Sequence, residues 1–395
     1  MGGFAGYVLV EGSTEDQSFA ITGFPSLGPV AGTTNTFPAG FGEYPWGTGC
    51  VVDCSNNAGS PDLGAFASVA VGHWQGDIVQ IYNVTDPTNP GSPWSLSTGL
   101  GPPNERNPNS PYTGIGVLAL SGSNLLVGEY NGPNIVFTNL SQGAGAPPSP
   151  YNPGGIGGTA GVDPAAGIFS VALSGTVAVV SGSYGFEVLF FNVPGASNPA
   201  VAGVNGKFTS AQWPAACATD GATVAIGDNA GIVYVFTVNP LATSQNGQQS
   251  VSFVGSYGTG MGAITSISVV TGNPTLVAAA NYNFSSISLI TVAPPTFSGV
   301  EYPVGTNNQS GAEGGAVRFF GAANLFASSM SNAQVYNLNP LSTPNPTPYG
   351  AAPLTLATSH QPTLGVTAIA PQLAGCLTQL LSSPIQLLRR FARRR

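Results

Sequence analysis

The sequence predicts an all-β fold assembled from one repeated antiparallel unit, and three observations support this. The 395-residue chain contains 55 glycines and 34 prolines, as expected of a protein with many short turns. Hydrophobic residues nevertheless make up 42% of the chain, so a large core can be buried. These apolar residues fall into short runs between the turns, and the runs recur along the whole chain.

The repeat is visible in six segments that share one pattern: an apolar strand, a short polar or glycine-containing turn, and a second strand. They cover residues 69–84, 125–140, 179–193, 224–238, 277–292 and 325–338. Their last residues are separated by 45 to 56 positions. That spacing is the size of one blade of a β-propeller with loops of variable length.

A further apolar strand precedes most of these segments and ends in a glycine-containing turn. Examples are residues 116–122, 169–175, 215–221 and 266–272. Such tight turns join antiparallel neighbours. The preceding strand is apolar over its whole length in most units, so we expect it to be an inner strand buried on both faces. A proline-rich stretch after each unit provides a fourth strand.

The two ends of the chain complement each other. Residues 6–12 and 18–24 look like the second and third strands of a unit without the first, and residues 364–371 look like a first strand alone. Joined in one sheet, they would close the ring and remove its open edges. We therefore expect a seven-bladed β-propeller over residues 1–371, closed by N- and C-terminal strands. A six-bladed ring with terminal arms, an eight-bladed ring and a pair of β-sandwiches are the alternatives.

This repeated unit resembles, in architecture, the WD-repeat propellers and related seven-bladed propellers over residues 1–371. The repeated Gly-His and Trp-Asp signature of true WD repeats is absent. The resemblance therefore implies the fold and does not imply the partners of that family.

Charge is scarce and unevenly placed. Charged residues make up 6% of the chain, against about 25% in an ordinary soluble protein. Residues 1–388 hold three basic residues against 16 acidic ones, a formal net charge of −13. A body this acidic is not expected to bind the phosphate backbone of a nucleic acid.

The remaining basic residues are concentrated in residues 372–395, which we predict to be an amphipathic, helical, arginine-rich tail. Ser383 suits a helix N-cap and Pro384 the first helical position. The residues expected to anchor the protein are Leu388, Arg389, Arg390, Phe391, Arg393, Arg394 and Arg395. Such a tail suits an acidic structural protein of a larger assembly, an anionic membrane surface or, here alone, nucleic acid. The alternative is a frayed, solvated end.

A recognition surface is predicted on the turns that join the second and third strands, because these turns emerge on one face of a propeller. The candidate ligand-binding residues are His73, Trp74, Glu129, Tyr130, Tyr184, Asp228, Asn229, Asn281 and Tyr282. Aromatic rings beside amides are typical of surfaces that bind proteins or glycans. The alternative is that these residues were selected only for turn conformation.

Nothing in the sequence indicates a catalytic site, a metal or a cofactor. His73 and His360 are the only histidines, and no nucleophile elbow or phosphate loop is found. Cys50 and Cys54 fall in one strand, too far apart for a disulfide, and we expect the four cysteines to be small buried hydrophobes. The alternative function is an extracellular propeller hydrolase of the lactonase type.

The expected location is extracellular or on a virion surface. No apolar run is long enough for a transmembrane helix, and the N-terminus does not read as a secretory signal. A surface of amides and hydroxyls does not depend on ion pairs, which suits exposure to an acidic medium. The sequence thus favours a non-enzymatic binding or structural propeller, such as a capsid-decorating protein, a host-attachment protein or a cell-surface adhesin.

Overall fold

The described part of the chain is built from β-strands. The computed structural model describes residues 5–11, 15–22, 26–36, 50–55, 68–73, 78–83, 94–97, 115–121, 124–129, 134–137, 150–151, 168–182, 185–190, 200–202, 214–239, 250–260, 262–281, 286–294, 296–303, 316–319, 324–328, 332–337, 347–348, 354–355 and 369–370. In these ranges every regular element is a strand. No helix long and apolar enough to cross a membrane is found among them.

The first three sheets each contain four antiparallel strands. The first sheet has the order β29 (Ile369–Ala370), β1 (Ala5–Glu11), β2 (Glu15–Thr22) and β3 (Ser26–Thr36). The second contains β4 (Cys50–Ser55), β5 (Ser68–His73), β6 (Ile78–Asn83) and β7 (Trp94–Ser97). The third contains β8 (Ile115–Ser121), β9 (Asn124–Glu129), β10 (Asn134–Phe137) and β11 (Pro150–Tyr151).

Four more sheets follow in chain order. The fourth contains β12 (Ile168–Ser174), β13 (Val177–Gly182), β14 (Gly185–Phe190) and β15 (Ala200–Ala202). The fifth contains β16 (Pro214–Thr219), β17 (Thr223–Asp228), β18 (Ile232–Asn239) and β19 (Ser250–Gly258). The sixth contains β20 (Ile264–Val270), β21 (Thr275–Asn281), β22 (Ser286–Ala293) and β23 (Thr296–Pro303). The last contains β24 (Ala316–Phe319), β25 (Asn324–Ser328), β26 (Asn332–Asn337), β27 (Thr347–Pro348) and β28 (Leu354–Thr355).

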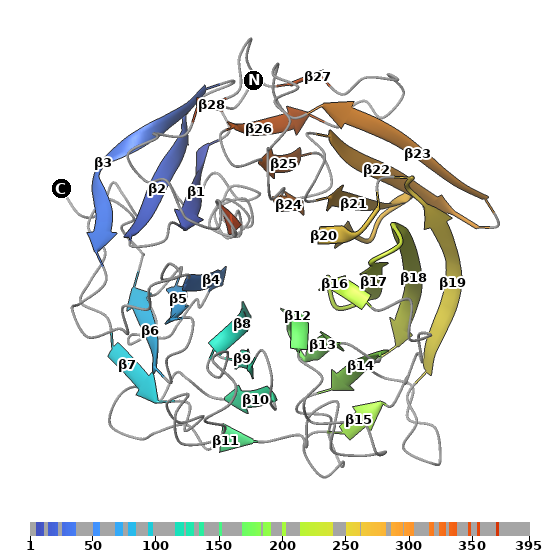
Figure 1. Ribbon diagram of the computed structural model, residues 1–395, viewed down its shortest axis with the longest axis horizontal. Coiled ribbons are helices and arrows are strands. Elements are labelled where there is room, and N and C mark those ends of the chain that lie inside the picture. The colour runs from blue at the N-terminus through green and yellow to red at the C-terminus, as the bar shows by residue number, and fades with distance from the viewer. Residues whose placement is uncertain are drawn as a thin grey trace, which may run out of the picture.

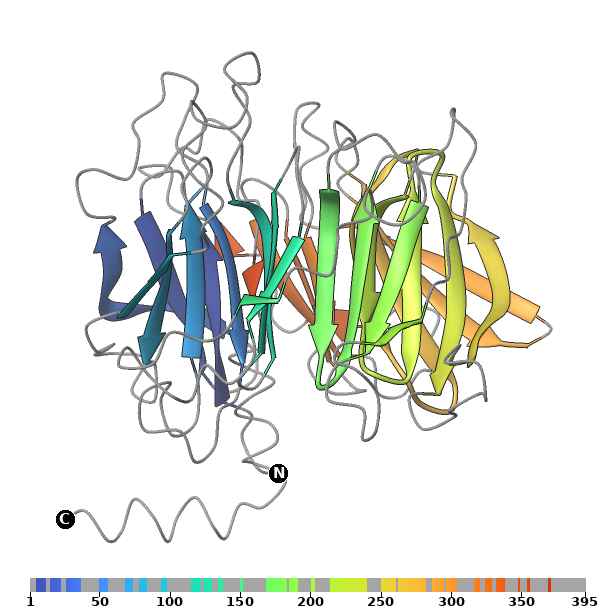
Figure 2. The ribbon, with the colours of Figure 1, turned by 90° about the horizontal axis from the view of Figure 1, so that it is seen from below.

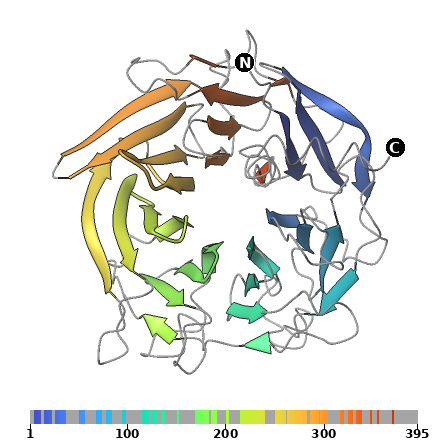
Figure 3. The ribbon, with the colours of Figure 1, turned by 180° about the vertical axis from the view of Figure 1, so that it is seen from behind.

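The sheets are arranged around a central axis, with the first strand of each nearest to it (Figure 1). Seen from the side, the strands run through the thickness of a disc (Figure 2), and the same ring is seen from behind (Figure 3). The predicted all-β fold of antiparallel propeller sheets is therefore confirmed. Strands β8, β12, β16 and β20 begin within two residues of the inner strands expected from the sequence.

The second strand of a sheet is buried more completely than the first. All six residues of β13 and all six of β17 are buried. In contrast, β20 is buried only in part: Ile267, Ser268 and Val269 are buried, whereas Thr265 is exposed. A second strand has hydrogen-bonded neighbours at both edges and a sheet packed on each face, whereas one edge of the first strand faces the axis.

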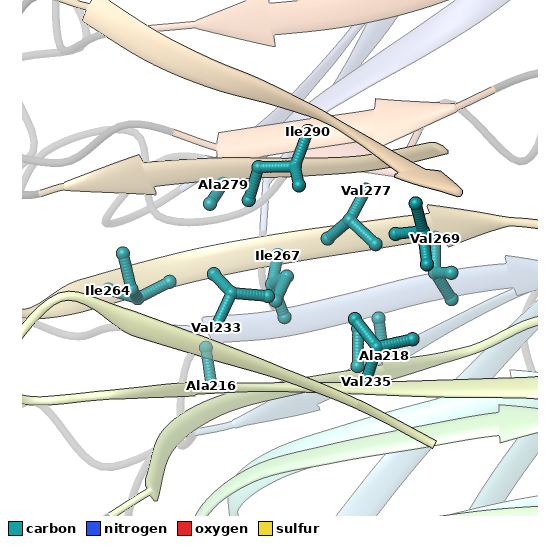
Figure 4. Close-up of a cluster of buried hydrophobic side chains, with 12 residues drawn as sticks. Ala216, Ala218, Val233, Val235, Ile264, Ile267, Val269, Val277, Ala279 and Ile290 are labelled. Atoms are coloured by element: carbon teal, nitrogen blue, oxygen red, sulfur yellow. The ribbon is translucent and has the colours of Figure 1, made fainter. Parts of the chain in front are cut away.

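The core lies between neighbouring sheets rather than in one central mass. Side chains alternate along β17, so that Val224 and Ile226 pack against the fourth sheet while Ala225 packs against the sixth. The cluster between the fifth and sixth sheets is apolar throughout, and it places Val235 of β18 near Val269 of β20 (Figure 4). Burial of each such valine stabilises the fold by roughly 1.5–3 kcal/mol.

One kind of hydrogen bond crosses each junction from the third sheet to the last. The side-chain acceptor belongs to the earlier sheet and the backbone N–H donor to the later one. The donor and acceptor pairs are Gly175 N to Ser121 Oγ (2.9 Å), Cys217 N to Ser170 Oγ (3.1 Å), Thr271 N to Asp220 Oδ2, Val317 N to Ser266 Oγ (3.1 Å) and Phe319 N to Ser268 Oγ (3.0 Å). These junctions are therefore joined by polar as well as apolar contacts.

Candidate binding face

The turn between β17 and β18 shows how the predicted binding face is constructed. Asp228 ends β17, and its Oδ1 accepts hydrogen bonds from the backbone amides of Ala230 (2.9 Å) and Ile232 (2.7 Å). Gly231 has a φ of 84°, a conformation that residues with a Cβ rarely adopt. The sequence Asp-Asn-Ala-Gly thus folds into this turn for local reasons.

The carboxylate of Asp228 is wholly enclosed, with an exposed fraction of 0%. Its Oδ2 accepts a hydrogen bond from the hydroxyl of Tyr234 at 3.1 Å. Burial of the phenol and the adjacent carboxylate together raise the pKa of Tyr234 to about 12. The carboxylate of Asp228 therefore holds the turn in place.

A neighbouring loop holds the same turn from the other side. The backbone amide and the hydroxyl of Thr259 both donate to the carbonyl oxygen of Gly231, at 2.9 Å and 2.8 Å. Thr259 is itself buried, whereas Ala230 is exposed and Asn229 is partly accessible. The turn is therefore a fixed platform, and the residues it presents to solvent are Asn229 and Ala230.

Three other candidates occupy the position of Asp228 in their own sheets. His73, Glu129 and Asn281 each end the second strand of a sheet, as Asp228 does. Each also pairs with the first residue of its innermost strand: His73 with Cys50, Glu129 with Ile115, Asn281 with Ile264 and Asp228 with Pro214. The backbone thus brings these four predicted residues to equivalent positions, although only for Asp228 is the side chain described.

The remaining candidates lie outside the described residues. These are Trp74, Tyr130, Tyr184 and Tyr282 on the face, and Leu388, Arg389, Arg390, Phe391, Arg393, Arg394 and Arg395 in the tail. The predicted aromatic surface and the predicted helical tail both stay predictions.

Cys217 illustrates the expected behaviour of a cysteine in this fold. Its side chain is 6% exposed and its thiol is free. The sulfur lies 3.5 Å from Ser170 Oγ and 3.7 Å from the carbonyl oxygen of Val179. Burial raises the pKa of this thiol to about 11. The prediction of a small buried hydrophobe is confirmed for Cys217, the one cysteine whose side chain is described.

Sequence reasoning missed a polar cluster in the turns between first and second strands. Asp220 Oδ1 accepts from the amides of Ala222 (3.1 Å) and Thr223 (2.9 Å), while Oδ2 accepts from Thr271 in the next sheet. The hydroxyls of Thr223 and Thr271 are 2.6 Å apart. The Asp-Gly dipeptide indicated the turn, but the contact with Thr271 depends on how two sheets pack. Groups of three or more His, Cys, Asp or Glu side chains suited to a metal are absent from the described residues.

Comparison with known proteins shows the fold and leaves the family open. No family model and no curated protein matches the sequence. Among solved structures, the chain is similar to a candidate 6-phosphogluconolactonase from Bacteroides uniformis, with a TM-score of 0.60, 12% identity, and coverage of 93% of this chain and 99% of that one. It is also similar to the β-propeller domain of Myceliophteria thermophila Cps50 (Swd1), with a TM-score of 0.50, 10% identity, and coverage of 83% and 94%. The chain thus has the β-propeller fold shared by these proteins.

Proposed function

We propose that this protein is a non-enzymatic binding and structural propeller that acts on the outside of a cell or of a virus particle. The observation that carries the proposal is the state of Asp228, the acidic candidate of the binding face whose side chain is described. Its carboxylate is buried and accepts hydrogen bonds from two backbone amides and a tyrosine hydroxyl. A carboxylate in this state stiffens a platform, which is what a recognition turn requires.

The ligand of this platform is a glycan or a protein surface. The sequence surrounds the equivalent turn positions with aromatic and amide side chains, among them Trp74, Tyr130 and Tyr282. Rings of this kind supply contact area at a small entropy cost, and amides supply adaptable hydrogen bonds. The platform is held in place before binding, so less ordering free energy is lost on association.

We also infer that the seven sheets described form one closed ring. The supporting observation is that β29, from the C-terminal part of the chain, pairs with β1. Val10 pairs with Ile369, and Leu9 pairs with Ala370. Strand β29 also contacts β24 of the last sheet and β4 of the second. A strand in that position joins the two ends of the ring.

The tail is proposed as the anchor to a larger structure. Five arginines and an apolar stripe follow a body that carries a formal charge of −13, which suits an acidic structural protein or an anionic membrane. We expect removal of residues 382–395 to leave the propeller folded and to detach it from the native particle or surface, measured by co-sedimentation. Normal incorporation of the truncated protein would show that the anchor lies elsewhere.

The binding face is tested with alanine substitutions of Trp74, Tyr130 and Tyr282 in the full-length protein. We expect each to weaken binding to a glycan array or to the native host surface, while Thr176→Ala, an exposed substitution in a turn between first and second strands, leaves it unchanged. Circular dichroism establishes that each variant is folded. Equal binding by all four variants would show that the face is not the recognition surface.

The alternative is a lactonase-type hydrolase, favoured by the description of the Bacteroides uniformis protein of similar fold. The direct measurement is hydrolysis of 6-phosphogluconolactone with and without added divalent cations. Turnover that depends on the cation and is lost in Glu129→Gln would establish an enzyme and remove the binding proposal.

A further inference from the structure

A large part of the ring carries no charge. Residues 229–300 contain no aspartate, glutamate, lysine, arginine or histidine. This stretch includes strands β18 to β22 and β23 up to residue 300, which is the outer half of the fifth sheet and all of the sixth except the end of β23 with Glu301. The formal charge of −13 on residues 1–388 is therefore carried by residues 1–228 and 301–388.

The outer rim of this uncharged sector is formed by β19 and by β23 up to residue 300 (Figure 1). Strand β19 has nine residues, whereas the outermost strands β7, β11 and β15 have four, two and three. Among the described strands, β19 is hydrogen-bonded only to β18, on its inner side. It contains none of the charged residues or prolines with which proteins commonly protect such an edge.

Phe253 projects from the middle of β19. Its side chain is 59% exposed, and it is the exposed large hydrophobic residue of the described part of the chain. The ring of Phe253 contacts that of Phe236 on its inner side, with centroids 5.4 Å apart. Ser252 and Ser256 on the same strand are also exposed.

The equivalent position in the sixth sheet is protected. In the fifth sheet, Phe253 of β19 pairs with Phe236 of β18. At the equivalent place in the sixth sheet, Gly299 of β23 pairs with Ile290 of β22. Gly299 has no side chain, and the hydroxyl of Tyr257 lies where its Cβ would be. Strands β19 and β23 thus contact each other at Gly255 and Gly299, whereas the ring of Phe253 on β19 is exposed.

We propose that β19 is the self-association edge of this protein, where two copies pair β19 to β19 in antiparallel orientation across a two-fold axis. Such a contact is isologous, so each copy supplies the same donors, acceptors and Phe253 ring to the other. The charge distribution selects a second copy as the occupant. Two bodies of equal negative charge repel each other, and they can approach closely where neither carries a charge.

The test uses the full-length protein in a concentration series followed by sedimentation equilibrium. We expect the wild type to dimerise, and Phe253→Lys to raise the dissociation constant by at least about tenfold, because it places two like charges at a desolvated edge. Ser256→Lys should act in the same way while leaving the ring of Phe253 in place. The matched control is Ser95→Lys, an exposed position on the outermost strand β7 of the second sheet, which should leave the dimer intact.

Two results would overturn the proposal. One is a wild type that stays monomeric at every concentration, which would assign the edge to a different partner or to none. The other is a dimer that resists Phe253→Lys and Ser256→Lys as well as Ser95→Lys. Circular dichroism shows whether each variant is folded. If Phe253→Lys does not fold, the result for Ser256→Lys decides between the outcomes.

Discussion

The carboxylate of Asp220 accepts a hydrogen bond from the backbone amide of Thr271, which lies 51 positions further along the chain and belongs to the next sheet. The two oxygens of this carboxylate have separate tasks. Oδ1 stabilises its own turn through Ala222 and Thr223, and Oδ2 reaches the neighbouring sheet. One side chain thus forms a turn and joins two sheets.

This division of tasks can be tested with two substitutions. Asp220→Asn keeps one acceptor oxygen for the turn and replaces the other by a donor that cannot serve Thr271. We expect it to lower the free energy of unfolding by about 1 kcal/mol, and Asp220→Ala to lower it by about 2 kcal/mol. Urea denaturation is the measurement, with Thr176→Ala as an exposed control. If Asp220→Asn is as stable as the control, the contact between the sheets contributes nothing.

The serine contacts predict a set of similar losses. Replacement of Ser170, Ser266 or Ser268 by alanine leaves a backbone amide of the next sheet without its acceptor. Each loss should cost about 1–3 kcal/mol, with Ser268 the most sensitive because its side chain is 5% exposed. Ser252→Ala, on the exposed face of β19, should change stability by no more than about 0.5 kcal/mol. Thermal melts that are alike for all four variants would contradict the role given to these hydroxyls.

Gly227 is required by the close approach of two sheets. A Cβ at this position would lie 2.6 Å from the Cβ of Ile264, which is buried and cannot move aside. Gly227→Ala is expected to destabilise the protein by about 1–3 kcal/mol through overpacking. The matched control is Gly258→Ala, where no atom lies within 4 Å of the added methyl group. Equal melting temperatures for the two variants would mean that the two sheets can move apart to accept the added methyl group without a loss of stability.

The buried thiol of Cys217 predicts a pH dependence. Its pKa rises from 9.0 to about 11 on folding, so the folded state holds this proton more tightly than the unfolded state. The contribution of the buried, protonated thiol to the free energy of unfolding is complete below pH 9.0 and is lost as the pH rises towards about 11. Peptide mapping after alkylation at about pH 8 should find Cys217 protected in buffer and modified in urea. Equally rapid modification in both solutions would place the thiol at the surface.

Closure of the ring predicts a difference between two truncations. Removal of residues 369–395 deletes β29 with the tail, whereas removal of residues 382–395 deletes only part of the tail. The longer deletion should lower the melting temperature and expose the edge of β1, because Leu9 and Val10 lose their partners. The shorter one should melt like the full chain. Identical melting of both would show that β29 does not hold the ring together.

The inner strands of the sheets could be predicted from the sequence because they depend on the local pattern of apolar runs and turns. The inner strands, such as β12 and β16, were found to within one residue at their start because apolar runs and glycine turns delimit them. Outer strands such as β3 and β19 were not located, since residues like Ser250 and Gly258 carry a weak strand signal.

The candidate site was less predictable, for a reason that Asp228 makes clear. An acidic residue in a turn can face solvent and bind a ligand, or it can turn inward and bind its own backbone, and the sequence is the same in both cases. The nearby Tyr234 favours the second arrangement by donating to the carboxylate from the following strand. That contact depends on register, as the one between Asp220 and Thr271 depends on packing between sheets.

The hydrogen bonds between neighbouring sheets limit how the sheets can be rearranged. The fourth, fifth and sixth sheets each provide a side-chain acceptor to the sheet that follows and a backbone N–H donor to the sheet before. Removing or exchanging one of these three sheets would therefore break the hydrogen bonds on both of its sides, even if the apolar surfaces still fitted. In a closed ring, by contrast, moving the chain ends to another loop would keep all of these hydrogen bonds. The sheets are repeated units, but each one fits only between neighbours that carry the matching hydrogen-bond donor and acceptor.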